Sequence, residues 1–227
     1  MKFEAVIFDC DGVLVNSEAL GIEIERKALA SFGLHYEYEE FLTRFMGLSD
    51  DDYLKALDAD RQSRLGEALP DHFETIVEDE RQCVYATELK PIAGVAAFVA
   101  AMAMPKAVAS SARIEALARN LRLTTLHDLF APHIYSAELV ENGKPAPDLY
   151  LFAAERLDRS PASCLVIEDS EHGVRAGVAA GMTVWGFTGG GHADQGLGDR
   201  LRAAGADLIF ADFAALGASA FPVRKPG

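Results

Sequence analysis

The sequence predicts an α/β protein in which helices alternate with short parallel strands and a purely helical segment interrupts the alternation once. An apolar strand, Val6 to Phe8, opens the chain, and residues 17–87 show only helical periodicity. From Lys90 onward, short apolar runs alternate with amphipathic helices, as in βαβ units of a parallel sheet. We therefore expect a Rossmann-like core domain of residues 1–16 and 88–227, with residues 17–87 inserted as an α-helical domain.

The composition is that of a folded, acidic protein. Half of the 227 residues are hydrophobic, a quarter are charged, and the formal net charge is −14. Lys and Arg do not cluster, so we expect no nucleic-acid partner and no membrane partner. No apolar run approaches the ~20 residues of a membrane span. Met1 and Lys2 lead straight into a strand without a leader peptide, and the expected location is the cytoplasm.

Cysteine usage fits the same location. The three cysteines are far apart and show no CxxC spacing, which argues against a disulfide framework and against a cysteine zinc site. Cys10, Cys83 and Cys164 are interpreted as small hydrophobic residues in a reducing compartment.

The inserted segment is typical of a small helical bundle. Asn16 and Ser17 are suited to cap a first helix, whose apolar residues recur every fourth position until Gly33 ends it. Further helices are predicted at Tyr38 to Phe45, Asp50 to Leu57, Gln62 to Leu69 and Phe73 to Cys83. The chain crosses between the two domains twice, near residues 14–17 and 86–91, and two adjacent crossings permit a hinge.

The rest of the core domain alternates strands and helices. Strands are predicted at Lys106 to Ala109, Ile134 to Tyr135, Cys164 to Ile167, Thr183 to Phe187 and Leu208 to Phe210. Helices are predicted at Gly94 to Met102, Ile114 to Leu121, Pro147 to Leu157, Gly173 to Ala180 and Gln195 to Ala204. Phe221 to Gly227 carry two prolines and two cations and are predicted to form a loose tail.

Two carboxylates follow the first strand, in the sequence Asp9-Cys10-Asp11-Gly12. Ligands bind at the carboxyl ends of parallel strands, so both acids are expected to face a site. The pattern also has a plainer interpretation, because Asp and Gly are common in tight turns.

Polar residues also close later strands of the core. Ser110 and Ser111 follow one strand, Lys144 lies in a loop with two prolines, and Glu168 and Asp169 follow another strand. Each of these residues also has a plainer interpretation when it is considered alone. The serines are suited to cap a helix, the lysine could lie on the surface, and the acids could belong to a solvated turn. Taken together, an acid, a hydroxyl, a cation and an acidic pair at strand ends predict a phosphate site with a divalent metal.

The chemistry of phosphoryl transfer explains this combination. A carboxylate nucleophile approaches a phosphoryl group only when cations neutralise its oxygens. Asp9, Glu168 and Asp169 supply the hard oxygen ligands that Mg²⁺ prefers, while Lys144 adds a positive charge and Ser110 a donor. Asp9 is the expected nucleophile. Asp11 is placed to protonate the leaving oxygen and later to deprotonate water.

Four stretches of the core carry a resemblance to a known family. In chain order they are FDCDGVLVNSE, VASS, NGKPAPD and VIEDSEHGVRAGVAAGM. They resemble the four motifs of the haloacid dehalogenase superfamily of phosphohydrolases. The acid at Asp11 is similar to the phosphatase and mutase branches, and the insert resembles the helical cap of the β-phosphoglucomutase and phosphoglycolate phosphatase-like subgroup.

The resemblance implies a role for each motif residue. Asp9 would form an aspartyl-phosphate, Asp11 would act as acid and base, and Ser110, Ser111 and Lys144 would bind the phosphoryl group. Mg²⁺ would be bound by Asp9, the backbone carbonyl of Asp11, and Asp169, with Glu168 close by.

The chain departs from the family pattern in places. Members often carry an aspartate where this chain has Asn16, which we interpret as a hinge or cap variation. Mutases of the subgroup carry His and Arg at the places that correspond to Gly21 and Asp50, and lacking both cations disfavours a mutase.

The cap residues expected to contact substrate are Arg44 and Gly47, although Arg44 is equally suited to be a solvated helix cation. His172 is interpreted as a turn residue. His192 ends a run of glycines that we expect to be a mobile loop at the rim.

The expected function is a Mg²⁺-dependent phosphatase acting on a small phosphorylated metabolite, either a sugar phosphate or a sugar-acid phosphate. The protein is expected to act as a monomer. The alternatives are a sugar phosphomutase and a catalytically silent binding protein on the same fold.

Overall fold

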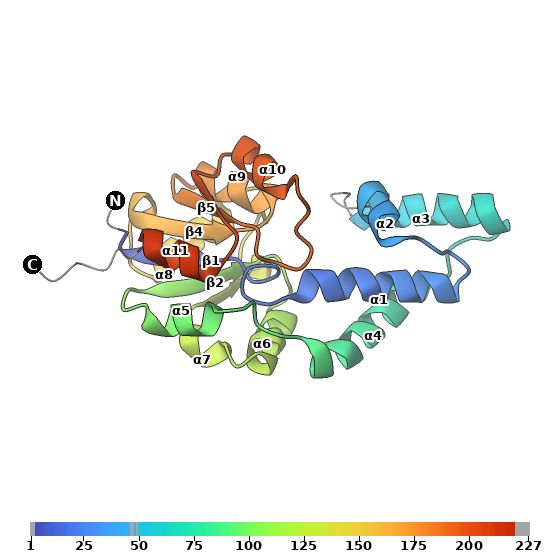
Figure 1. Ribbon diagram of the computed structural model, residues 1–227, viewed down its shortest axis with the longest axis horizontal. Helices are drawn as coiled ribbons and strands as arrows, with labels where there is room; N and C mark the ends of the chain where they lie inside the picture. The colour runs from blue at the N-terminus through green and yellow to red at the C-terminus, as the bar shows by residue number, and fades with distance from the viewer. Residues whose placement is uncertain (1–2, 46–47, 49, 221–227) are drawn as a thin grey trace, which may run out of the picture. The chain divides into compact units, whose positions relative to one another are not determined.

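The computed structural model describes residues 3–45, 48 and 50–220, and it divides into two compact units. The α/β unit comprises residues 1–19 and 89–227, and the helical unit comprises residues 20–88 (Figure 1). The predicted tail at 221–227 lies outside the described residues.

The α/β unit is built on a six-stranded sheet with the order β3-β2-β1-β4-β5-β6, in which every strand pair is parallel. The predicted parallel α/β core is confirmed. The strands are β1 (Ala5–Phe8), β2 (Lys106–Ser110), β3 (Ile134–Ser136), β4 (Cys164–Glu168), β5 (Thr183–Phe187) and β6 (Leu208–Phe210). The chain runs outward from β1 to β3 on one side and from β4 to β6 on the other, so the topological switch point lies between β1 and β4.

The strand register aligns the carboxyl ends of the three central strands. Phe8 of β1 lies opposite Val108 of β2 on one side and Ile167 of β4 on the other. The polar residues that follow these strands therefore emerge at one edge of the sheet, beside the switch point.

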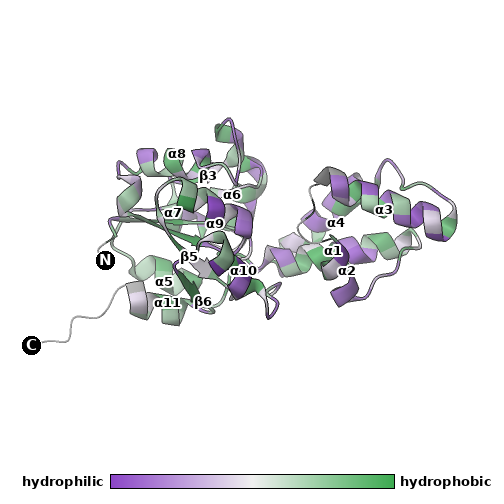
Figure 2. Cartoon of the chain, turned by 90° about the horizontal axis from the view of Figure 1, so that it is seen from above, coloured by the Kyte–Doolittle hydropathy of each residue, from purple (hydrophilic) through white to green (hydrophobic). Residues whose placement is uncertain are grey.

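Helices cover both faces of the sheet. Helix α8 packs against β1, β2 and β3, α9 against β4 and β5, and α10 against β5 and β6. The helices of this unit are α5 (Val95–Ala101), α6 (Ile114–Leu123), α7 (His127–Phe130), α8 (Asp148–Arg156), α9 (Glu171–Ala179), α10 (Leu197–Ala204) and α11 (Phe213–Ala220), with 3-10 turns at Ala137–Leu139 and Pro161–Ser163. In Figure 2 the strands between these helices are green, which marks them as hydrophobic.

Neighbouring side chains of β1 show which helices pack on each face of the sheet. Ile7 belongs to the core cluster that includes Tyr150 and Ala153 of α8. The next residue, Phe8, packs its ring edge-on against Phe98 of α5 and Phe130 of α7. Because neighbouring side chains on a strand point to opposite faces, α8 covers one face while α5 and α7 cover the other.

Three details of the α/β unit differ from the sequence prediction. Helices α7 and α11 are additional. Phe213 of α11 packs on Phe98 and Phe187, and Asp212 accepts a hydrogen bond from the Ala215 amide at its start, so tertiary contacts and a cap stabilise a weakly patterned segment. Helix α9 begins earlier than predicted because Ser170 caps it by accepting from the Gly173 amide.

The helical unit contains α2 (Tyr38–Phe45), α3 (Asp50–Leu65), α4 (Phe73–Glu88) and most of α1 (Ser17–Ser31). Its core includes a cluster of aromatic rings formed by Tyr36, Phe41, Phe45 and Tyr53, in which Phe41 and Phe45 are tilted and the other cited pairs are edge-on. As predicted, α1 ends before Gly33, whose φ is +84°.

The two helices predicted at 50–57 and 62–69 were wrong, because a single α3 runs through the polar stretch between them. That stretch contains no glycine or proline, and Asp60 within it accepts hydrogen bonds from Tyr36 and Arg44. The helix ends before Gly66, whose φ is +71°.

The two crossing segments pair with each other inside the α/β unit. The Asn16 amide donates to the Lys90 carbonyl at 3.0 Å, and the Ile92 amide donates to the Leu14 carbonyl at 2.9 Å. In the part of the chain that the structure describes, no helix has both the length and the apolar character needed to span a membrane.

Candidate active site

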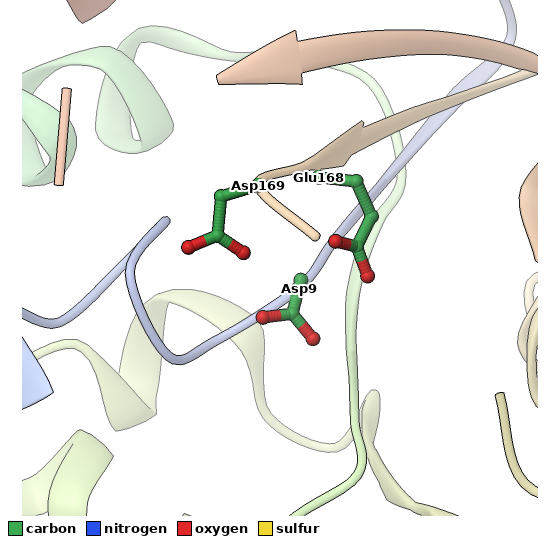
Figure 3. A group of neighbouring side chains, drawn as sticks. All are labelled: Asp9, Glu168 and Asp169. Carbon is green, nitrogen blue, oxygen red and sulfur yellow. The ribbon is translucent and has the colours of Figure 1, made fainter. Parts of the chain in front are cut away.

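Three carboxylates converge where β1 and β4 end. Asp9 directly follows β1, Glu168 is the last residue of β4, and Asp169 comes next. One oxygen of each lies within 4.8 Å of the others, and all three residues are buried. Figure 3 shows the three side chains lying near one another. The register of the parallel sheet thus unites residues that are far apart in the sequence.

Lys144 is shared between two of these acids. Its Nζ donates to Asp9 Oδ1 at 2.5 Å and to Glu168 Oε1 at 2.7 Å, and its side chain is only 4% exposed. The ammonium also lies 5.0 Å from the centre of the Tyr150 ring. The lysine is therefore held between the acids and an aromatic face instead of lying on the surface.

Glu168 is held through both of its oxygens. Besides Lys144, Oε1 accepts from the Tyr150 hydroxyl at 2.9 Å, while Oε2 accepts from the amide and the hydroxyl of Ser170 at 2.9 and 3.0 Å. Burial acts to raise the pKa of Glu168, but Lys144 and these hydrogen bonds outweigh it and leave the pKa below its ordinary value. Glu168 and Lys144 therefore form the ionised pair of the site.

Asp9 and Asp169 are the two acids of the site whose pKa values are raised. Burial raises the pKa of Asp9 to about 8, against the lowering effect of Lys144. Burial, followed by repulsion from Asp9 and Glu168, raises the pKa of Asp169 well above its ordinary value. Ionising all three buried acids beside the Lys144 ammonium would leave a net negative charge, and their oxygens are hard ligands. The residues present therefore fit a divalent cation such as Mg²⁺.

Asp11 lies beside this cluster and is oriented by two hydroxyls. Ser17 Oγ donates to Asp11 Oδ1 at 2.6 Å, and Ser110 Oγ is 3.4 Å from Oδ2. Ser110 is buried and also accepts from the Ala112 amide, whereas Ser111 is exposed. The structure thus brings Ser110 to the acids and leaves Ser111 on the outside.

Two glycines leave room for the acids. A Cβ on Gly12, where φ is +76°, would lie 1.8 Å from Asp169 Oδ2, and a Cβ on Gly173 would lie 1.6 Å from Glu168 Oε1. Both positions are closed to any side chain unless a buried carboxylate moves.

Gly173→Ala is expected to displace Glu168 and to lower both stability and activity. Overpacking of this kind costs about 1–3 kcal/mol of unfolding free energy, and the Lys144 pair is disturbed as well. Urea unfolding and phosphate release measure the two effects. Gly198→Ala on α10 is the matched control: its Cβ would meet nothing closer than 3.6 Å, so stability should hold or rise by up to about 1 kcal/mol. Equal unfolding free energies and equal rates of phosphate release for the two variants would contradict the prediction.

The residues predicted for the cap lie in the helical unit. Arg44 donates to Asp60 at 2.6 Å and to Glu40 at 3.3 Å, and its guanidinium lies 5.4 Å from the centre of the Tyr36 ring. Gly47 lies outside the described residues. A substrate role for Arg44 and Gly47 stays a prediction.

Sequence reasoning missed residues that the fold brings to the site. Tyr150 lies on the buried face of α8, where an aromatic residue is expected for packing alone. Ser17 was interpreted only as a helix cap. His192 was assigned to a mobile loop, yet its side chain is 10% exposed and lies next to Asp169, whereas His172 is exposed. Burial lowers the pKa of His192. Ser17 lies within the first quoted motif, whereas no local pattern marks Tyr150 or His192 as a site residue.

The comparisons with known proteins agree on one family. A family model described as haloacid dehalogenase-like hydrolase matches residues 6–187. A phosphorylated carbohydrates phosphatase of Thermotoga maritima is 34% identical over 79% of this chain and 82% of its own length. A 6-phosphogluconate phosphatase of Escherichia coli is 28% identical over 82% and 83%. A haloacid dehalogenase family hydrolase of Deinococcus radiodurans, solved with bound phosphate and sodium, is 35% identical, with a TM-score of 0.82 over 96% of this chain and 94% of the other.

Proposed function

The chain belongs to the haloacid dehalogenase-like hydrolases and is a phosphoric monoester hydrolase, and from this premise we propose that it is a Mg²⁺-dependent phosphatase of small phosphorylated carbohydrates that works through an aspartyl-phosphate intermediate. The family resemblance and the enzyme class predicted from the sequence are confirmed. The observation that carries the proposal is the buried group of Asp9, Glu168 and Asp169, in which the Lys144 ammonium contacts Asp9 and Glu168.

Asp9 is the proposed nucleophile. A carboxylate oxygen of Asp9 attacks phosphorus, the ester bond breaks, and the leaving oxygen takes a proton from Asp11. In the second step Asp11 accepts a proton from water, the water oxygen attacks phosphorus, and the bond to Asp9 breaks to release phosphate. The hydroxyl contacts from Ser17 and Ser110 support this role because they hold the Asp11 carboxylate beside the site.

The remaining residues bind the phosphoryl group and the metal. Lys144 would balance charge on the phosphoryl oxygens, and the Ser110 hydroxyl would donate to one of them. Asp9, Asp169 and the Asp11 carbonyl would hold Mg²⁺, with Glu168 beside them. When bound, the cation would neutralise phosphoryl charge that otherwise repels the Asp9 carboxylate.

A phosphorylated carbohydrate is the proposed substrate class. The named activities of the Thermotoga and Escherichia coli relatives support it, as does a hexitol phosphatase of Escherichia coli that is 30% identical over 78% of this chain. We further propose that the helical unit serves as the cap domain and selects the substrate. A cap of this kind excludes bulk water from the reaction.

Phosphate release from a panel of substrates tests the proposal. The panel contains hexose phosphates, hexitol phosphates, 6-phosphogluconate, phosphoglycolate and p-nitrophenyl phosphate, each with Mg²⁺ and with EDTA. We expect release that depends on Mg²⁺ and is fastest with one carbohydrate phosphate. Release that is unaffected by EDTA would overturn the metal dependence. If no phosphate is released but a sugar bisphosphate activates conversion of one sugar monophosphate into its isomer, the protein is a phosphomutase. If the panel stays inert throughout, the protein is a silent member of the fold.

A further inference from the structure

His192 is a largely enclosed histidine that the proposed mechanism does not use. Its Nε2 lies 3.3 Å from Asp169 Oδ2, and the two side chains are 10% and 6% exposed. Within the described residues, Nδ1 has no hydrogen-bond partner. The ring therefore contacts the site through Nε2, on the side where Asp169 lies.

A glycine loop carries His192 to this position. After β5 the chain passes through Gly189, Gly190 and Gly191. The Gly191 amide donates to Asn16 Oδ1 at 2.9 Å. A Cβ on Gly190 would lie 2.7 Å from the Gly12 carbonyl oxygen, and one on Gly191 would lie 2.7 Å from Asn16 Oδ1. The loop packs so closely on the turn after β1 that side chains at these positions would separate them.

The turn after β1 provides the space in which His192 and Asp169 meet. A Cβ on Gly12 would lie 1.8 Å from Asp169 Oδ2 and 2.7 Å from His192 Cε1. The missing side chain at Gly12 thus makes room for both partners. Three segments far apart in the sequence, the turn after β1, the end of β4 and the loop after β5, converge on one carboxylate.

We propose that His192 is a positioning residue that fixes the carboxylate of Asp169, and that Asn16 holds the loop that carries it. The inference rests on the proposed function, in which Asp169 is a metal ligand. The imidazole Nε2 lies 3.3 Å from Oδ2 and thereby restricts rotation of the carboxylate. Losing such an orienting partner typically costs about 10–100-fold in metal affinity or activity.

Mg²⁺ affinity, measured by calorimetry on the metal-stripped full chain, tests the inference without substrate. We expect His192→Phe, which keeps a ring but no nitrogen, to weaken Mg²⁺ binding by at least about tenfold. His192→Gln places an amide N–H near the position of Nε2 and should restore most of the affinity. His172→Ala, at an exposed histidine of α9, is the matched control and should bind Mg²⁺ like the wild type.

Variants of Asn16 test the loop separately. Asn16→Ala removes the acceptor for the Gly191 amide and should weaken Mg²⁺ binding in the same direction. Asn16→Asp keeps an acceptor oxygen and should bind like the wild type. These variants leave His192 in the chain, so they remain informative if His192→Phe does not fold.

The outcomes separate the inference from the proposed function. If the wild type binds Mg²⁺ and His192→Phe binds it equally well, the positioning role is overturned and the proposed function stands. A lower unfolding midpoint in EDTA with unchanged Mg²⁺ affinity would show a structural role only, which also overturns the inference. If the wild type itself neither binds Mg²⁺ nor requires it for phosphate release, the proposed metal site fails and the inference fails with it.

Discussion

Asp9→Asn is expected to reduce phosphate release by at least about 10⁴-fold while the protein stays folded. An amide nitrogen or oxygen does not replace the carboxylate as a nucleophile, so the aspartyl-phosphate cannot form. The fold should persist because the amide oxygen can still accept from Lys144, as Asp9 Oδ1 does. Phosphate release at saturating Mg²⁺ measures the first effect.

The stability of the same variant is a second, independent result. Burial raises the pKa of Asp9 to about 8, so the ionised carboxylate is unfavourable in the metal-free protein. Replacing it with a neutral amide should leave the urea midpoint in EDTA unchanged or higher. Asp199→Asn, at an aspartate 86% exposed on α10, is the control and should change neither activity nor stability. Wild-type turnover by Asp9→Asn would refute the nucleophile assignment.

Lys144→Met is expected to lower both stability and activity. The change leaves Asp9, Glu168 and Asp169 buried without a cation of the chain, and breaking a buried ion pair by removing one partner costs about 3–5 kcal/mol. Phosphate release should fall by at least about 10²-fold because the charge on the phosphoryl oxygens loses its ammonium partner. Urea unfolding in EDTA and phosphate release in Mg²⁺ measure the two effects.

A second substitution separates the two roles of this lysine. Adding Glu168→Gln to Lys144→Met removes one of the stranded charges, so part of the stability should return while activity stays low. Lys106→Met is the matched control, because Lys106 lies at the start of β2 and, among the described residues, its Nζ donates only to the Met102 carbonyl. Activity restored along with stability in the double variant would contradict a phosphate-binding role for Lys144.

Strand periodicity and strand ends are local properties, and both could be predicted. Each strand predicted after the first one is observed within one residue of its expected bounds. Local sequence patterns did not predict the helices that tertiary contacts stabilise. The polar stretch around Asp60 continues α3 because Tyr36 and Arg44 engage its carboxylate, and α11 is stabilised by Phe98 and Phe187.

The sequence by itself determined which residue types end the strands at one edge of a parallel sheet. That rule correctly places Asp9, Ser110 and Glu168 at one site, because parallel strands in register present their carboxyl ends together. The tertiary structure alone decided which polar groups pair. Lys144 lies 135 residues from Asp9 and Asn16 lies 175 residues from Gly191, yet each pair is joined by a hydrogen bond. Partner choice in a buried site depends on close packing between distant segments, and no local pattern records it.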